Sequence, residues 1–235
     1  MTDSPAQTST APPAAAPAGG TRTLRRDAAE NRERVLRAAW EVFGEQGPEA
    51  GVEEIARRAG VGMGTLYRRF PTKEALVQAL NDALMEEILA TARRTLAEEP
   101  GGGGLEAYLW FTGELMSAHH GCLTRLWQAN LPGTDPRREE LWGTVGQLLE
   151  RAKQAGEVRE DLTLTDVYLC VLALRGLVDD TAAPAPEVWR RYLAVVLAGF
   201  RPAARPLDFR PADDSLVETG IPGCGAGQAR AHPRP

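Results

Sequence analysis

The sequence predicts an all-α protein in which a small three-helix domain is joined by a long helix to a larger helical bundle. Apolar residues recur at helical spacing through most of residues 24–200. No segment shows the alternation of apolar and polar residues that is typical of a half-buried β-strand. Stretches rich in Gly and Pro end the helical segments. The chain has 235 residues, of which 43% are hydrophobic, so it is long enough to bury a substantial core.

The two ends of the chain differ in composition from its centre. Residues 1–20, "MTDSPAQTSTAPPAAAPAGG", have almost no large apolar side chains, so burial cannot compensate for the entropy lost on ordering. Residues 201–235 contain repeated prolines that interrupt regular structure. We therefore expect two disordered tails, around an N-terminal domain at 21–71 and a C-terminal domain at 72–200.

Residues that end or cap helices separate the expected helices within the folded part. Gly47 and Pro48 end the first helix, Thr72 is the expected N-cap of the long helix, and "EEPGGGG" at 98–104 separates that helix from the next. The apolar residues that mark the expected helices lie at 35–43, 52–59, 63–70, 75–88, 105–116, 123–130, 141–155, 164–178 and 187–200.

Charge is distributed unevenly along the chain, whose net charge is −5. Residues 21–73 hold 11 basic and 8 acidic residues, or +3, whereas the remainder holds 16 and 24, or −8. A basic N-terminal segment on an acidic body indicates a local face for nucleic acid. No apolar run reaches the roughly 20 residues of a membrane-spanning helix, and no secretory leader is evident, so we expect a cytoplasmic protein.

The cysteine and histidine patterns indicate neither a metal site nor a catalytic site. Cys122, Cys170 and Cys224 have no CxxC spacing, so neither a disulfide framework nor a thiolate metal site is expected, and the first two are interpreted as small buried residues. His119 and His120 are adjacent and point in different directions on a helix. No GxSxG motif occurs, and we predict no catalytic residue, metal or cofactor.

The stretch "GVGMGTLYRRFPTKEAL" at 60–76 has two possible interpretations. A nucleotide-binding loop requires GxGxxG after a strand or a GK[ST] motif, whereas these glycines are spaced GxGxG and follow an amphipathic helix. In a helix-turn-helix, Gly60 supplies a positive φ and Gly62 helps to form a tight turn. The residues that would then point inward are Met63, Leu66 and Phe70. Those that would point outward are Thr65, Arg68 and Arg69, and Tyr67 would lie at the edge.

A short helix that exposes hydroxyl and guanidinium groups suits the major groove of DNA. Taken singly, an Arg-Arg pair is more often a solvated helix face, and Tyr67 is equally explained as a packed aromatic ring with its hydroxyl in water. The combination of turn, short helix and basic face favours the helix-turn-helix.

Two segments carry a family resemblance. "RERVLRAAWEVFGEQG" and "VEEIARRAGVGMGTLYRRFPTKEALV", which run from about Arg32 to Val77, resemble the N-terminal DNA-binding domain of the TetR family of transcriptional regulators. "LLERAKQAGEVREDLTLTDVYLCVLALRGLV" is similar to one C-terminal subclass of that family. The resemblance implies a homodimer whose two recognition helices enter successive major grooves of a palindromic operator, about 34 Å apart. It also implies that a small molecule bound among the C-terminal helices releases the DNA.

The resemblance also assigns expected DNA contacts. Thr65 and Tyr67 are expected to contact phosphates or base edges, and Lys73, at a helix N-terminus, is expected to contact a phosphate. Arg68 and Arg69 are expected to add positive charge near the DNA backbone. Met63 and Gly64 lie on the same surface. Arg22, Arg25 and Arg26 in "RTLRR" either reach the minor groove or phosphates or form a solvated lead-in. The sequence departs from the family at Ala50 and Gly51, where many members have a capping Ser or Thr, and at Gly64, which has no side chain to contact bases.

The segments 164–178 and 187–200 are apolar around most of their circumference. Either they form the central core of a monomer or they also pack against a second subunit, which the resemblance favours. The expected interface residues are Tyr168, Val171, Leu172, Trp189, Tyr192 and Val196.

Candidate ligand-binding residues are the aromatic and polar side chains on the expected pocket helices. They are Trp110, Phe111, Glu114, Trp127, Leu148 and Arg175. Ordinary core packing is the favoured explanation for Trp110, Phe111 and Leu148, because aromatic residues at helical spacing usually fill cores. Glu114 and Arg175 lie in apolar stretches, so each must be paired, exposed or used on a ligand.

The function predicted from the sequence is that of a ligand-responsive transcriptional repressor. Two alternatives remain at this stage: a helical enzyme with an incidental basic face, and an architectural or activating DNA-binding protein without an effector.

Overall fold

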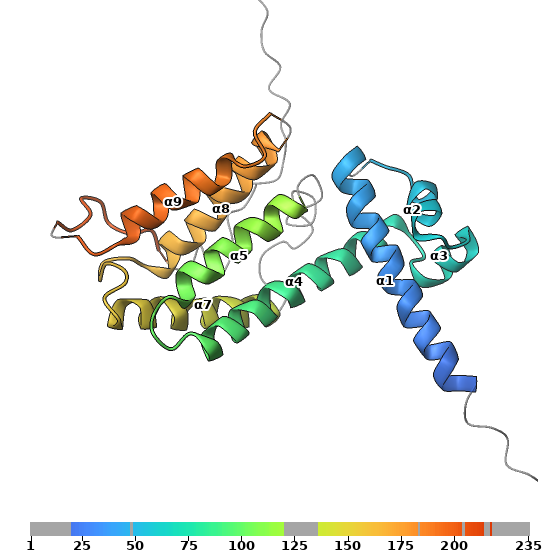
Figure 1. Cartoon of the computed structure of the whole chain (residues 1–235), viewed down its shortest axis with the longest axis horizontal. Helices are drawn as coiled ribbons and strands as arrows, with labels where there is room; N and C mark the ends of the chain where they lie inside the picture. The colour runs from blue at the N-terminus through green and yellow to red at the C-terminus, as the bar shows by residue number, and fades with distance from the viewer. Residues whose placement is uncertain are drawn as a thin grey trace, which may run out of the picture.

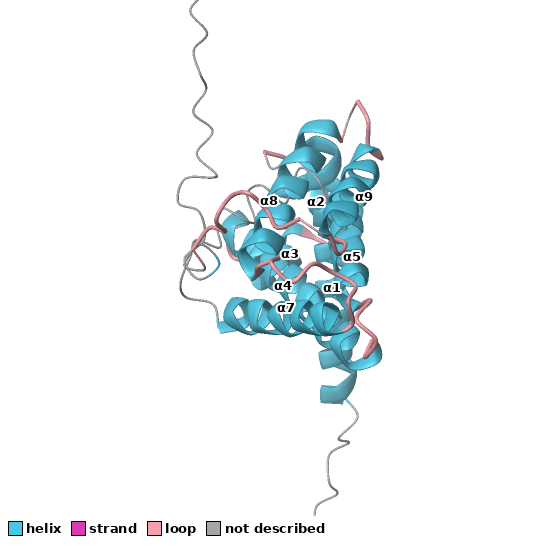
Figure 2. Ribbon diagram, turned by 90° about the vertical axis from the view of Figure 1, so that its left-hand side faces the viewer, coloured by secondary structure: helices cyan, strands magenta, loops and turns pink. Residues whose placement is uncertain are grey.

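The computed structural model describes residues 20–47, 49–119, 136–182, 184–203, 205–213 and 217, and of residues 20–28 only the backbone. Within these ranges there are eight helices and no strand, and Figure 2 accordingly shows only helix and loop. The predicted all-α fold class is confirmed. The helices are α1 (Gly20–Gln46), α2 (Val52–Ala59), α3 (Met63–Arg69), α4 (Lys73–Glu98), α5 (Gly104–Ala118), α7 (Pro136–Gln154), α8 (Leu164–Thr181) and α9 (Val188–Phe200).

The helices form two groups, which Figure 1 shows side by side. Helices α1, α2 and α3 make up the first group, called the head below. In the second group, called the bundle, α5 and α7 pack against the far part of α4, and α8 and α9 pack against α5. Helix α4 has 26 residues, so it is about 39 Å long and extends from the head into the bundle. None of the described helices is long and apolar enough to cross a bilayer.

Most expected helices lie within a few residues of the observed ones. The first differs: α1 begins at Gly20, so the backbone of Arg22, Arg25 and Arg26 is helical and continuous with the helix that packs in the head. The predicted helix at 123–130 lies outside the described residues, as do Cys122, Cys224 and His120.

The core of the head is formed by the apolar stripe of α1 and the inner face of α2. Val35, Ala39, Val42 and Phe43 of α1 are buried, as predicted, and Ile55 of α2 is fully buried among them. The hydrophobic effect therefore holds α2 against α1.

The core of the bundle is richer in aromatic side chains. The rings of Trp142 on α7 and Tyr168 on α8 meet edge to face, with centroids 5.1 Å apart. Trp189 of α9 lies against α5 at Gly113, where an added Cβ atom would be 2.3 Å from the Trp189 Cζ3 atom. Only glycine allows this close approach of α5 and α9. Cys170 is buried, as predicted, and burial raises the pKa of its thiol to about 11.

Besides α4, an aromatic contact links the head to the bundle. The rings of Trp40 on α1 and His119, directly after α5, have centroids 4.2 Å apart. Burial lowers the pKa of His119, so its imidazole is neutral at pH 7.

Part of the segment after α9, which the sequence analysis predicts to be a disordered tail, contacts the bundle. The guanidinium of Arg159 donates to the carbonyl of Arg205 (2.9 Å), and the backbone N–H of Leu207 donates to Asp161 Oδ2 (2.9 Å). Further along, the side chain of Val217 is buried. Prolines prevent a helix here, but they do not prevent hydrogen bonds to a turn on the bundle.

Candidate nucleic-acid interface

The turn after α2 is built by one glycine. Gly60 has φ +65°, which is the left-handed conformation, as the sequence predicted. With Gly60 in this conformation, the N–H of Val61 donates to the carbonyl of Ala56 (3.0 Å), which closes the C-terminus of α2. The chain therefore changes direction at once and brings α3 across α2.

Helix α3 depends on its neighbours for stability. It has seven residues, and a helix this short is unstable in isolation. Leu66 is its one buried side chain at 1% exposed, and Phe70 follows as a second buried anchor. Gly62 is the N-cap with φ −71°, a conformation that any residue adopts, so the turn does not require glycine at this position. Gly51 similarly caps α2 without a side-chain hydrogen bond.

The outer surface of α3 is basic. Arg68 and Arg69 are exposed, and Tyr67 is 44% exposed. Thr65 and Met63 are half-buried. From residue 60 to 73 there are three basic residues and no acidic one, so this surface is positively charged.

Gly64 leaves an open place on this surface. It is exposed, and no atom lies within 4 Å of the position that a Cβ atom would occupy. Packing inside the protein therefore does not explain the glycine.

The start of α4 adds to the same positive region. The hydroxyl of Thr72 accepts a hydrogen bond from the N–H of Ala75 (3.1 Å), as predicted for an N-cap. Lys73 is the first residue of α4, and its ammonium group lies 5.7 Å from the centre of the Phe43 ring on α1. Its charge and the N-terminal end of the α4 dipole have the same sign, and together they favour an anion such as a phosphate.

The chain resembles known regulators along most of its length. A family model described as bacterial regulatory proteins of the tetR family matches residues 35–80, and one described as the SbtR-like transcriptional regulator C-terminal domain matches residues 105–202. The structure of a TetR transcription regulatory protein from Mycobacterium vanbaalenii is 33% identical to the chain, with 76% of this chain and 99% of that one covered and a TM-score of 0.58. The chain belongs to the TetR family.

Further TetR-family relatives differ in how much they share with the chain. A TetR transcriptional regulator from Streptomyces coelicolor is 34% identical, with 74% of this chain and 99% of that one covered and a TM-score of 0.57. An HTH-type transcriptional regulator of Staphylococcus aureus is 46% identical over 54 residues, which is 23% of this chain and 29% of that protein. The chain thus spans less than a third of this curated relative. The TetR family is one of transcriptional regulators rather than of enzymes.

The candidate ligand residues of this TetR-family chain occupy different environments. Trp110 and Phe111 on α5 are half-buried, and the Trp110 indole donates to Glu106 Oε1 (3.4 Å). Leu148 is buried in the core. Trp127 lies outside the described residues, and Arg175 is buried on α8.

Glu114 is on the surface, which contradicts its assignment to a pocket. It is exposed on α5 and forms a two-oxygen pair with Arg190 of α9, with Nη2 to Oε2 at 2.8 Å. An ion pair between helices therefore explains this charge in an apolar stretch.

The expected interface residues divide into two sets. Tyr168, Val171 and Trp189 are buried within a single TetR-family chain, so the prediction that they contact a second subunit is wrong. Apolar residues around most of a helix include those that face its own bundle, and the sequence pattern alone does not separate the two faces. Leu172 and Tyr192, like Val196, are half-buried.

Asn81 of α4 is not among the site residues predicted from the sequence. Its side chain is 2% exposed, and neither Nδ2 nor Oδ1 has a hydrogen-bond partner in the part of the chain that the structure describes. The available signal was an amide at helical spacing from the apolar residues Leu84, Met85 and Ile88. A buried amide without partners is costly, so this side chain is a candidate for a role other than packing.

Proposed function

We propose that the protein is a ligand-responsive repressor, which binds a palindromic DNA operator as a homodimer and is released from it by a small molecule. The observation that carries this proposal is the basic outer surface of α3 next to the N-terminus of α4. Arg68 and Arg69 are exposed there, and no acidic residue lies between 60 and 73. In the family's geometry, Thr65, Tyr67 and Lys73 contact phosphates or base edges.

Homodimer formation is supported by the outer face of α8 and α9. Val195 is 57% exposed and Val188 is 39% exposed, although both are apolar. Leu172, Tyr192 and Val196 are half-buried beside them. A second copy of the chain would remove this apolar surface from water.

Effector binding in the bundle is supported by the buried amide of Asn81. A small molecule with one hydrogen-bond donor and one acceptor would satisfy both of its unpartnered atoms. Trp110 and Phe111, half-buried on α5, offer aromatic contact area, and the buried Arg175 offers positive charge. These four residues are the proposed effector contacts.

The decisive experiment selects duplexes from a random pool with the full-length protein and then measures affinity by fluorescence anisotropy at several salt concentrations. We expect sequence-preferring binding that weakens steeply with salt. Arg68→Met should weaken binding and reduce the slope of log affinity against log salt by about 1. The matched control is Arg210→Met, in the exposed segment after α9. Binding without sequence preference, or none, would remove the regulator proposal.

Dimer formation is tested by sedimentation of Val195→Asp. We expect the wild type to sediment as a dimer and the variant to shift to a monomer, because a carboxylate on each side of an apolar interface is both desolvated and repelled. Leu207→Asp, at a residue 53% exposed outside this face, should remain a dimer. A monomeric wild type would refute the homodimer.

Repression and release are tested by transcription in vitro from a promoter that carries the selected duplex. We expect less transcript when the protein is added, and more transcript would make it an activator. A compound that restores transcription with the wild type but not with Asn81→Leu would support the proposed effector contact. Equal response of both proteins would exclude Asn81 from that role.

A further inference from the structure

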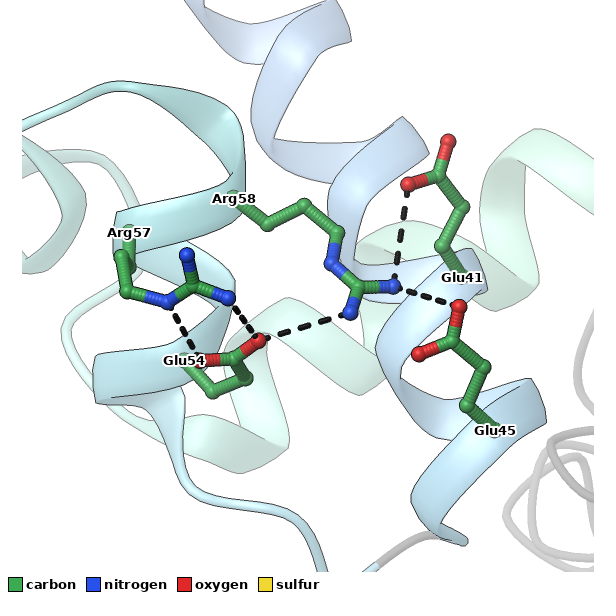
Figure 3. Close-up of polar contacts among 5 residues, drawn as sticks. All are labelled: Glu41, Glu45, Glu54, Arg57 and Arg58. Atoms are coloured by element: carbon green, nitrogen blue, oxygen red, sulfur yellow. Dashed lines mark hydrogen bonds and ion pairs between the residues drawn. The ribbon is translucent and has the colours of Figure 1, made fainter.

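Arg58 of α2 lies among three carboxylates, two of which are on α1 (Figure 3). Its Nη1 atom lies 2.7 Å from Glu45 Oε1 and 3.9 Å from Glu41 Oε2, both on α1. Its Nη2 atom lies 3.4 Å from Glu54 Oε1 on α2 itself. Glu41 and Glu45 are one helical turn apart, so a single guanidinium spans a full turn of the neighbouring helix. The hydrogen bond from Arg58 lowers the pKa of Glu45.

The adjacent arginine makes a different set of contacts. Arg57 donates from Nε to Glu54 Oε2 (2.7 Å) and from Nη2 to Glu54 Oε1 (2.6 Å), both within α2. Figure 3 shows its guanidinium directed at Glu54 of the same helix, whereas the guanidinium of Arg58 reaches Glu41 and Glu45. The Arg57 side chain is 71% exposed, whereas that of Arg58 is 24% exposed. The two arginines therefore carry the same charge on the same helix, but only Arg58 reaches α1.

Arg58 supplies directional contacts that the apolar packing of α2 lacks. Val52, Ile55 and Ala59 hold α2 on α1 by burial, which is non-directional and tolerates small slides and rotations. Charge-assisted hydrogen bonds weaken steeply when their geometry changes. Arg58 thus restricts the position of α2 along α1.

The position of α2 determines that of the DNA-facing helix. Helix α3 follows α2 after Gly60, Val61 and Gly62, and Leu66 is its one buried side chain. A displacement of α2 is therefore carried to Arg68 and Arg69.

We propose that Arg58 is a positioning residue for DNA binding, which holds α2 on α1 through Glu41 and Glu45 and so sets the pose of α3. This inference rests on the proposed function, since it assumes that α3 contacts DNA. The guanidinium of Arg58 is already paired with carboxylates, so in this proposal Arg58 does not bind a DNA phosphate. Exposed ion pairs contribute little to global stability, so its effect is on geometry rather than on the melting temperature.

The test compares Arg58→Met with the matched control Arg57→Met in the full-length protein, with the duplex selected by the wild type. Arg58→Met should weaken affinity by about 3- to 10-fold with an unchanged salt slope. Arg57→Met should change affinity less than about twofold. The double variant that combines Arg58→Glu with Glu45→Arg should recover part of the duplex affinity lost in Arg58→Met. The ion pair between α2 and α1 is rebuilt in it with the two charges exchanged. A salt slope reduced by about 1 would instead make Arg58 a phosphate contact and overturn the proposal.

A second measurement does not require DNA. Hydrogen exchange should be faster in residues 52–70 of Arg58→Met than in the wild type or in Arg57→Met, while exchange in α8 is unchanged. Equal exchange in the two methionine variants would overturn the positioning role. If the wild type selects no duplex, the proposed function fails, and the exchange data still decide whether Arg58 holds α2.

Discussion

The head and the bundle are both helical, but they hold their helices in different ways. In the head, α3 is anchored by Leu66 and the following Phe70, and its exposed residues are left free for a partner. In the bundle, α9 is anchored by Trp189, Leu193 and Leu197. The difference indicates that α3 has few buried side chains because most of its residues form an exposed surface. In contrast, α9 contributes large side chains to the core of the bundle.

The largest expected effect comes from removing the anchor of α3. Leu66→Ala should destabilise the head by about 2–5 kcal/mol, because it removes buried methyl groups and leaves a cavity. Hydrogen exchange should show faster opening of α3 with α8 unchanged. The control is Leu193→Ala, which is equally buried but in the bundle, and should produce the reverse pattern. Uniform opening of the whole chain by both variants would mean that head and bundle unfold as one unit.

A smaller loss is expected from the close approach in the bundle. Gly113→Ala should lower the free energy of unfolding by about 1–3 kcal/mol, because its methyl group would overlap the fully buried ring of Trp189. Gly143→Ala on α7, where nothing lies within 4 Å of the added atom, should be neutral or stabilising. Urea unfolding of both variants measures the difference. Equal stability would show that Trp189 moves to make room.

In the head, a glycine substitution should have opposite effects on stability and affinity. Gly64→Ala has open space for its methyl group and should stabilise the free protein by about 0.5–1 kcal/mol through helix propensity. If the DNA backbone approaches α3 closely at this point, the same change should weaken duplex binding. Thermal unfolding and anisotropy measure the two effects separately. Stronger binding by the variant would show that the position is open in the complex as well.

The contact between the two regions should respond weakly to pH. Burial lowers the pKa of His119 below its unfolded value of about 6.5, so its contribution to stability is present above pH 6.5 and is lost as pH falls through the lowered pKa. The effect should be less than about 1 kcal/mol, because the imidazole is only partly buried. His119→Phe keeps a ring against Trp40 without titrating, so its melting temperature should change less between pH 7.5 and 5. An identical pH response would exclude His119 as the cause.

The helical pattern of the sequence predicted the fold class and most of the helices. Apolar spacing identified the buried faces of α1 and α7, and residue chemistry identified the turn at Gly60 and the cap at Thr72. These are local features: a left-handed glycine and an N-cap hydroxyl act on residues within one or two turns. The predicted contacts of Thr65, Tyr67, Arg68 and Lys73 with DNA remain predictions.

Only the tertiary structure decided which neighbour each side chain contacts. Arg57 and Arg58 are adjacent and chemically identical, yet one bonds within α2 and the other bridges to α1. Glu114 was a candidate ligand contact until Arg190, 76 residues later, was found to pair with it. The sequence determined which surfaces are apolar or charged, because that depends on residue type and helical period. Partners distant in the sequence depend on how helices cross, and no local pattern encodes that angle.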